Sequence, residues 1–222
     1  MYVNADFSQP VVIGPDDYQW VPSPQSGVER VMLDRLGGEK ARATSIVRYA
    51  PKSIFPQHSH PGGEEIYVLS GTFSEGDRHY SAGSYLRNPP GSFHQPSSHE
   101  GAVIFVKLWQ MKPDEKQRVH INTQVPSNWQ QHGGRDICPL FSDGIETVIL
   151  QRMQPGESLF TASVSSAEWL LISGQLKTPD QSFEPGTWMR LPAGFYLDIT
   201  AGSQGAVVYL KTGHLPDMPE EA

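Results

Sequence analysis

The sequence predicts an all-β protein made of two similar halves. Glycine and proline number 21 and 19 among 222 residues, and they are spread between short apolar runs. Turn signals recur about every 8 to 12 residues, a spacing typical of a sandwich or barrel. No stretch has the periodicity of an amphipathic helix, and several segments recur at a constant separation along the chain.

The repeated segments indicate a duplicated domain. Glu65-Ile-Tyr-Val-Leu-Ser-Gly71, for example, is matched by Glu168-Trp-Leu-Leu-Ile-Ser-Gly174. The separation stays at 103 to 104 residues, which is far longer than a solenoid repeat. We therefore predict two domains, 1–125 and 126–222. The repeats are 44–51, 65–71, 83–91 and 102–107, which recur at 148–155, 168–174, 186–194 and 206–211.

The elements of the first half follow from the same patterns. Residues 1 to about 30 contain six prolines and glycines that interrupt any long element, so we expect an irregular arm anchored by Trp20. The charged segment 113–118 is expected to be a solvated connector. The predicted strands are 31–33, 43–49, 65–70, 73–74, 85–86 and 102–109, with Tyr80 on a further strand.

Composition excludes several classes of function. The formal charge of −7, without a cluster of lysine or arginine, argues against nucleic acid and anionic membrane as direct partners. No apolar run approaches the roughly 20 residues of a membrane span. The amino terminus lacks the features of a secretory signal. The single cysteine, Cys138, excludes an internal disulfide, fits a reducing cytoplasm and is expected to be a buried apolar residue. We expect a cytoplasmic protein and leave a homodimer open.

The stretch around His58 has the composition of a metal site. Because side chains alternate along a strand, His58 and His60 point to the same side. Pro61-Gly62-Gly63 reads as a turn, after which Glu64 opens an apolar strand. Imidazoles with a carboxylate suit zinc, iron, nickel, copper or manganese, and do not suit calcium.

A second stretch completes the motif. In Gly83-Ser-Tyr-Leu-Arg-Asn-Pro-Pro-Gly-Ser-Phe-His94, a rigid turn precedes His94 at the start of another strand. The two stretches together resemble the paired motifs of the cupin superfamily. That resemblance implies double-stranded β-helix (jelly-roll) barrels, and the duplication then makes the chain a bicupin. It also implies a three-histidine, one-glutamate metal site, whose ligands here are His58, His60, Glu64 and His94. Ser98 stands where the family often has asparagine.

Neighbouring residues are assigned other roles. Glu65 is the alternative to Glu64 as the carboxylate ligand. Only one of two adjacent strand residues can face inward, and the spacing to Gly71 favours Glu64. The second half has lost the ligands, because Ala167 and Leu197 stand opposite Glu64 and His94. Its interior is expected to be filled by Phe160, Trp169, Trp188, Phe195 and Tyr196, with a small apolar ligand pocket left open. The remaining histidines are expected on the surface, namely His79, His99, His120, His132 and His214.

A closer resemblance concerns 41–58, 62–65, 87–92 and Val106-Lys-Leu-Trp109. These segments are similar to the cupin domain of ChrR-type anti-sigma factors. In that family a separate helical domain holds an extracytoplasmic-function sigma factor, and the cupin domain responds to singlet oxygen or related oxidants. No part of this sequence resembles the helical domain, so a sigma factor or regulator is expected only through a separate domain or protein.

Two functional classes follow. The first is a non-enzymatic sensor of singlet oxygen or peroxide, linked to oxidative stress response and transcription regulation, in which one metal per chain holds a state that oxidant chemistry disrupts. The second is a metal-dependent dioxygenase or isomerase acting on a small molecule at open coordination positions. The sensor is slightly favoured, because the family resemblance is specific and no substrate-fixing pair of arginines or lysines is evident. Zinc is the first expectation for the metal, with iron, nickel and manganese as alternatives.

Overall fold

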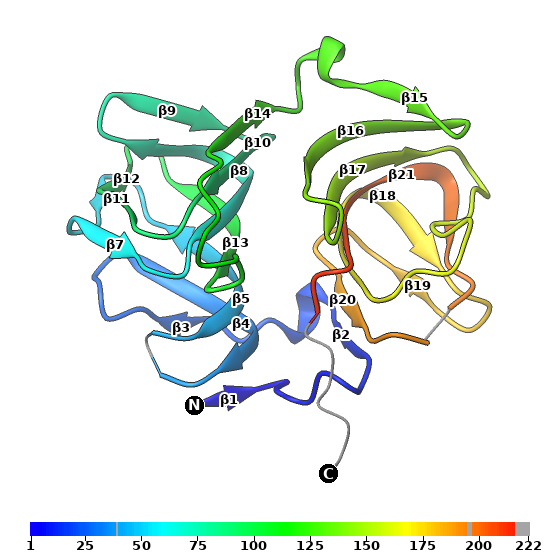
Figure 1. The fold of residues 1–222 in the computed structure, drawn as a ribbon, viewed down its shortest axis with the longest axis horizontal. Helices are drawn as coiled ribbons and strands as arrows, with labels where there is room; N and C mark the ends of the chain where they lie inside the picture. The colour runs from blue at the N-terminus through cyan, green and yellow to red at the C-terminus, as the bar shows by residue number, and fades with distance from the viewer. Residues whose placement is uncertain (39, 195–196, 216–222) are drawn as a thin grey trace. The chain divides into compact units, whose positions relative to one another are not determined.

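The computed structural model describes residues 1–38, 40–194 and 197–215. Within these ranges the regular structure is β, apart from two three-residue 3₁₀ helices, η1 (Pro15–Asp17) and η2 (Pro126–Asn128). Neither helix is long enough to cross a membrane. The chain divides into two compact units (Figure 1). Unit 1 contains Met1–Ala5 and Gln19–Gln124, and unit 2 contains Asp6–Tyr18 and the described residues from Val125 onward.

Unit 1 is built on one antiparallel sheet with the order β1-β4-β5-β13-β8-β10-β14, and β3, β6, β9 and β12 pair at its sides. A separate two-stranded sheet joins β7 and β11. The strands are β1 (Tyr2–Val3), β3 (Val21–Pro22), β4 (Val28–Leu36), β5 (Arg42–Tyr49), β6 (Ser53–Ile54), β7 (His58–His60), β8 (Glu64–Glu75), β9 (Arg78–Ser81), β10 (Ser84–Asn88), β11 (Ser92–His94), β12 (Pro96–Ser98), β13 (Ala102–Leu108) and β14 (Val119–Asn122).

Unit 2 repeats this plan with the order β15-β16-β17-β21-β18-β20-β2, and β19 pairs with β18. Its central order β16-β17-β21-β18-β20 corresponds strand for strand to β4-β5-β13-β8-β10. The segments that repeat in the sequence therefore occupy equivalent places in the two sheets. The strands are β2 (Val11–Ile13), β15 (Gln130–His132), β16 (Arg135–Ser142), β17 (Thr147–Met153), β18 (Ala167–Lys177), β19 (Ser182–Phe183), β20 (Trp188–Leu191) and β21 (Thr200–Thr212).

The amino-terminal arm is more ordered than the sequence predicts. Its strand β2 completes the sheet of unit 2, where Val11 pairs with Arg190. The corresponding edge of unit 1 is completed by β14, where Val119 pairs with Arg87. Val11-Val-Ile and Val119-His-Ile take the same register on equivalent strands, so the duplication includes these arms. The segment that precedes each repeat thus adds a strand to the sheet of the other repeat.

The same equivalence extends to the tryptophans that follow the two arms. The guanidinium of Arg48 lies 4.1 Å from the ring centroid of Trp20, and that of Arg152 lies 4.0 Å from the ring of Trp129. Each arginine also pairs with an acidic residue on the neighbouring strand, Glu29 in unit 1 and Asp136 in unit 2. Trp20 is therefore an anchor, as the sequence predicts, with a counterpart in unit 2.

The two units have separate hydrophobic cores. In unit 1 the core includes Ile66, Val68 and Phe73, all fully buried. In unit 2, Trp169 packs edge-on against Phe183, with ring centroids 5.5 Å apart. Trp188 is buried too, whereas Phe195 and Tyr196 lie outside the described residues. Cys138 is buried, as the sequence predicts.

Candidate metal centre

The short sheet of β7 and β11 brings the histidines together. The strands are antiparallel, with His58 opposite His94 and His60 opposite Ser92. Alternation along β7 turns His58 and His60 to the same side, and His94 joins them from the facing strand. The ring centroid of His58 lies 4.7 Å from that of His60 and 4.9 Å from that of His94.

Glu64 closes the group. Its two carboxylate oxygens each lie 3.6 Å from an imidazole nitrogen, Oε1 from Nε2 of His60 and Oε2 from Nε2 of His94. The two Nε2 atoms are themselves 2.8 Å apart. His60, Glu64 and His94 are buried, while His58 is partly exposed. The four residues singled out from the sequence therefore lie in one cluster, which we call the His3Glu cluster.

The turn between β7 and β8 depends on its glycines. Gly63 has a φ of +76° and donates its N–H to the carbonyl of His60. A Cβ on Gly62 would lie 2.5 Å from the ring of Trp109, so no larger residue fits without displacement. The tight turn starts β8 at Glu64 and brings this carboxylate back over the histidines. Glu65 has a different partner, because its carboxylate pairs with Nη1 of Arg87 at 2.8 Å.

A second carboxylate, not singled out from the sequence, also belongs to this site. Nδ1 of His94 lies 2.5 Å from Oε1 of Glu75, at the far end of β8. Glu75 is eleven residues from Glu64, which in a regular strand would place the two on opposite faces. The pairing of β8 with β13 shifts register, because Val68 and Ser70 oppose successive residues and Leu69 is extra. This bulge restores Glu75 to the face of Glu64. In the sequence, Glu75-Gly76-Asp77 follows an apolar strand and indicates only a turn.

The surroundings fix how the imidazoles carry their protons. Burial acts to lower the pKa of His94, but the charge of Glu64 and the hydrogen bond to Glu75 outweigh it and raise that pKa. Burial raises the pKa of Glu75, but its bond to His94 prevails and the pKa is lowered. Burial, partly offset by the charge of Glu64, lowers the pKa of His60.

The tautomers that result are those that metal ligands require. In the neutral form of His94, an ionised Glu75 accepts the Nδ1 proton, which leaves Nε2 with a lone pair in the cluster. Nδ1 of His58 lies 2.9 Å from the carbonyl oxygen of Pro56, which can only accept, so His58 carries its proton there too. Two of the three histidines therefore present an unprotonated Nε2.

The spacing of the donor atoms also fits a metal. Two nitrogens bound at 2.0–2.1 Å are about 2.9 Å apart at a right angle and about 3.3 Å apart in a tetrahedron. The observed separations of 2.8 and 3.6 Å bracket these values. All three histidine ligand atoms lie within 4.8 Å of one another. The residues present can hold one divalent transition metal with small adjustments.

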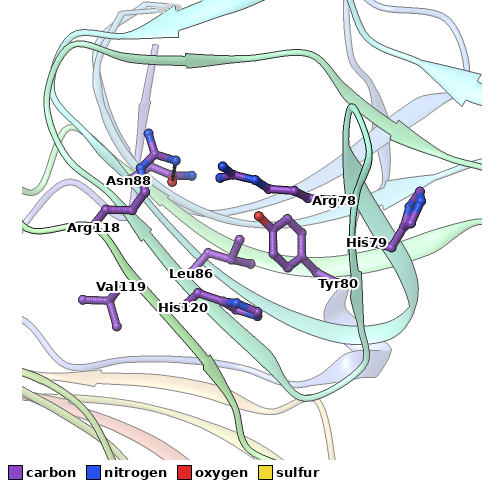
Figure 2. Close-up of a pocket in the computed structure, with 8 residues that line it drawn as sticks. All are labelled: Arg78, His79, Tyr80, Leu86, Asn88, Arg118, Val119 and His120. Carbon is purple, nitrogen blue, oxygen red and sulfur yellow. Dashed lines mark hydrogen bonds between the residues drawn. The ribbon is translucent and has the colours of Figure 1, made fainter.

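A pocket of about 360 Å³, whose lining residues Figure 2 shows, is linked to the cluster by two of those residues. Asn88 belongs to its wall and donates from Nδ2 to Oε2 of Glu64 at 3.3 Å. Tyr80 belongs to the wall as well and donates to Oε2 of Glu75 at 3.5 Å. The pocket is thus one hydrogen-bonded residue away from each carboxylate of the centre. It is lined by Arg78, His79, Tyr80, Leu86, Asn88, Arg118, Val119 and His120.

The connector 113–118 is not simply solvated. Nε of Arg87 donates to Glu115 at 2.7 Å, and the side chain of Glu115 is 11% exposed. Arg118 donates from Nη1 to Oδ1 of Asn88 at 2.8 Å. The charges of this segment thus pair with buried residues because β14, which follows directly, is drawn onto β10.

Residues 8–112 match the family model described as the ChrR cupin-like domain. This segment, slightly less than half of the chain, is therefore similar to a ChrR cupin-like domain. The match spans the whole His3Glu cluster and most of unit 1. A search of curated protein sequences gave no match.

Solved structures of cupin type resemble the chain over nearly its whole length. A candidate dioxygenase of Nostoc punctiforme has a TM-score of 0.77 at 15% identity, covering 96% of this chain and 88% of its own. The pirin YhhW of Escherichia coli, in complex with nickel(II), has a TM-score of 0.65 at 10% identity, with coverages of 92% and 98%. A cupin 2 conserved barrel domain protein of Leptotrichia buccalis has a TM-score of 0.59 at 13% identity, with coverages of 95% and 99%. At such identities the likeness concerns the fold alone. The chain is all-β and has the jelly-roll fold of cupins, as the sequence predicts.

The His3Glu cluster has no counterpart in unit 2 among the described residues. Both groups of potential metal ligands found there, His58-His60-His94 and Glu64-Glu75-His94, belong to unit 1. Ala167, which is equivalent to Glu64 in the sequence repeat, is buried in the apolar core. Leu197, which is equivalent to His94, is 38% exposed.

His214 departs from the surface position that the sequence predicts for it. The side chain of His214 is 1% exposed, and its Nε2 lies 2.7 Å from Oε2 of Glu168. The other oxygen of Glu168 accepts from the indole of Trp188. This buried carboxylate orders the inside of unit 2 and is fully engaged, so it adds no ligand site. His120 is exposed, as the sequence predicts, and it also lines the pocket of unit 1 against Tyr80, with ring centroids 4.9 Å apart.

Proposed function

We propose that unit 1 binds one divalent transition metal through His58, His60, Glu64 and His94. The support is the convergence of three imidazole nitrogens and a carboxylate, with tautomers set by Glu75 and by the Pro56 carbonyl. Holding these groups together without a cation is costly, because polar groups lose hydration on burial. The donor set suits zinc, iron, nickel and manganese, and a nickel-bound pirin of similar fold is consistent with this range.

We further propose that this centre acts on a small molecule, as a metal-dependent dioxygenase or isomerase. The observation that carries this proposal is the 360 Å³ pocket, whose wall residues bond directly to both carboxylates of the centre. A closed structural zinc site would not need such a space. When bound, the metal supplies Lewis acidity and, for iron or manganese, access to oxygen chemistry.

The protein's own groups have defined roles in this proposal. Glu75 keeps the Nδ1 proton of His94 in place and so directs its Nε2 to the metal. Asn88 fixes one oxygen of Glu64, which orients that carboxylate at the pocket side. Leu86 and Val119 of the pocket offer apolar surface to the bound molecule. In a dioxygenase of the kind proposed, both atoms of O₂ enter the product and the substrate itself supplies the four electrons, so no external reductant is consumed.

The second candidate is an oxidant sensor of the ChrR type, which the family match over residues 8–112 favours. In this case singlet oxygen or a peroxide would react once with a ligand or nearby sulfur, and the metal would be released. A sigma factor would then be reached through a separate domain or protein. Sensor and enzyme differ in turnover and in metal retention.

One experiment separates these functions. The protein is loaded separately with zinc, iron, nickel and manganese, and metal content and oxygen uptake are followed during exposure to oxidant and to small carboxylic and phenolic compounds. Many turnovers with retained metal are expected for the enzyme. A single reaction with metal loss would overturn it in favour of the sensor. Metal content well below one per chain, unaffected by His94→Ala, would refute the centre itself.

A further inference from the structure

The pocket beside the metal centre carries two guanidinium groups at one end. Arg78 on β9 and Arg118, just before β14, extend toward one another there, and the Tyr80 hydroxyl points the same way (Figure 2). No acidic residue occurs among the described residues that line the pocket, although acidic residues outnumber basic ones by 24 to 17 in the chain. The pocket therefore has a local positive end in an acidic protein.

The rest of the pocket is suited to a carbon skeleton. Leu86 and Val119 line it with aliphatic surface, and Tyr80 and His120 add the edge-on ring pair already described. The volume of about 360 Å³ lies at the small end of the range of roughly 300–1,000 Å³ that is usual for ligand pockets. Such a space accommodates a small ring or a short chain, with its charged group at the arginines.

We propose that this pocket binds a small organic carboxylate, with Arg78 and Arg118 holding the carboxylate group. The guanidinium fork matches a carboxylate through two parallel hydrogen bonds. The apolar wall favours an organic acid over a purely inorganic anion. This assignment rests on the proposed metal-dependent function, because it names the substrate class of the same site.

Contacts around the pocket relate the bound acid to the metal centre. Arg118 is held by Oδ1 of Asn88, whose Nδ2 bonds to Glu64. The hydroxyl of Tyr80, which bonds to Glu75, points toward the side of Arg78 (Figure 2). Arg118 thus reaches a carboxylate of the metal centre through one hydrogen-bonded side chain, and Arg78 lies on the side of the Tyr80 hydroxyl. A carboxylate held by both would have its carbon skeleton beside the metal ligands.

This pair was not visible in the sequence. Arg78 and Arg118 are forty residues apart, and the second lies in a charged segment that predicts a solvated connector. They line one pocket only because β14 pairs with β10 on the side where β9 lies against β8. On this proposal Arg78 and Arg118 form the substrate-fixing pair that was not evident in the sequence, which removes one argument for the sensor.

The test uses 4-fluorobenzoate as the probe and fluorine NMR of the full chain. In zinc-loaded protein we expect saturable binding, weakened about tenfold or more by Arg78→Gln or by Arg118→Gln, since each removes a charged hydrogen-bond donor. The neutral 4-fluorobenzamide should bind at least about tenfold more weakly than the acid. Arg152→Gln is the matched control, because this exposed arginine of unit 2 lies outside the pocket.

Manganese-loaded protein gives a second readout. The fluorine signal of bound probe should broaden through the nearby paramagnetic ion, and Arg118→Gln should abolish the broadening while metal content is unchanged. Arg78→Lys keeps the charge without the fork and should bind between wild type and Arg78→Gln. Thermal unfolding verifies that each variant is folded.

The outcomes separate the two proposals. Binding that ignores both arginines, binding of acid and amide with equal affinity, full displacement of the probe by equimolar sulfate, or no binding at millimolar probe would each overturn the carboxylate site. Arginine-dependent binding in protein that holds no metal under any loading would support the carboxylate site and overturn the metal centre.

Discussion

The two units share a sheet order and differ in what lies inside them. In unit 1 the barrel interior holds the His3Glu cluster with Glu75, while in unit 2 the equivalent space is part of an apolar core that includes Trp169, Leu171 and Met189. Both arrangements support the same pairing of five central strands. The comparison teaches that the fold does not need the metal site. Unit 1 instead carries a cost for its buried polar groups, which the proposed metal would offset.

The largest expected effect is the response of the two units to metal removal. A ligand that binds only the native state adds about 4 kcal/mol at a thousandfold excess over its dissociation constant. Chelation of zinc-loaded protein should therefore lower the unfolding midpoint of unit 1 and leave that of unit 2 nearly unchanged. Calorimetry with hydrogen exchange at β8 and β18 checks this. Equal loss of protection in both strands would contradict the separation between the units.

The next effect concerns the arm that completes unit 2. Phe7 is 5% exposed, and its ring centroid lies 4.0 Å from the Arg190 guanidinium. Phe7→Ala should cost about 3 kcal/mol, as is usual for a buried aromatic side chain. Although Phe7 precedes the first repeat, hydrogen exchange should speed up in β18 and β20 of unit 2.

The matched control for Phe7 lies in the same arm. Tyr2 is 77% exposed, so Tyr2→Ala should change stability by less than about 0.5 kcal/mol. Faster exchange confined to β8 and β10 in Phe7→Ala would assign the arm to unit 1 and refute the pairing of β2 with β20.

A smaller effect, on zinc affinity, tests whether Glu75 supports the metal ligand His94. Glu75→Gln keeps the shape of the side chain but removes the charge that holds the His94 proton. Replacing a residue that hydrogen-bonds to a metal ligand typically lowers metal affinity about 10–100-fold, and we expect a loss of this size for zinc. Competition with a chromogenic chelator measures it. Glu100→Gln, whose exposed carboxylate bonds only to Thr72 among the described residues, should leave affinity unchanged; if it weakens zinc binding as much, a general charge effect operates instead.

A further effect tests the interior of unit 2. Burial raises the pKa of Cys138 from 9.0 to about 11, so the folded thiol stays neutral where the unfolded thiol ionises. Because the native state then binds more protons, stability should fall as pH rises from about 9 to 11. Cys138→Ala should remove this slope. Thiol labelling at pH 8 should be slow in native protein and fast in denaturant; fast labelling of native protein would show that the core is open.

Local patterns carried most of the metal-site prediction. His58, His60, Glu64 and His94 lie within 37 residues, and their convergence follows from strand alternation and one glycine turn. The duplication was equally readable, because equivalent strands keep equivalent apolar patterns. These features depend on near neighbours in the chain, so the sequence by itself determined them.

Tertiary structure decided the rest. Glu75 reaches His94 only through the bulge at Leu69, which arises from pairing with β13 and leaves no mark in the local pattern. The arms Val11-Val-Ile and Val119-His-Ile fit either sheet edge equally well by sequence, and long-range pairing assigned each to the other repeat's sheet. The same pairing brought Arg118 to Arg78. Strand pairing between distant segments depends on the whole fold, because any short β-strand offers the same backbone hydrogen bonds to any open edge.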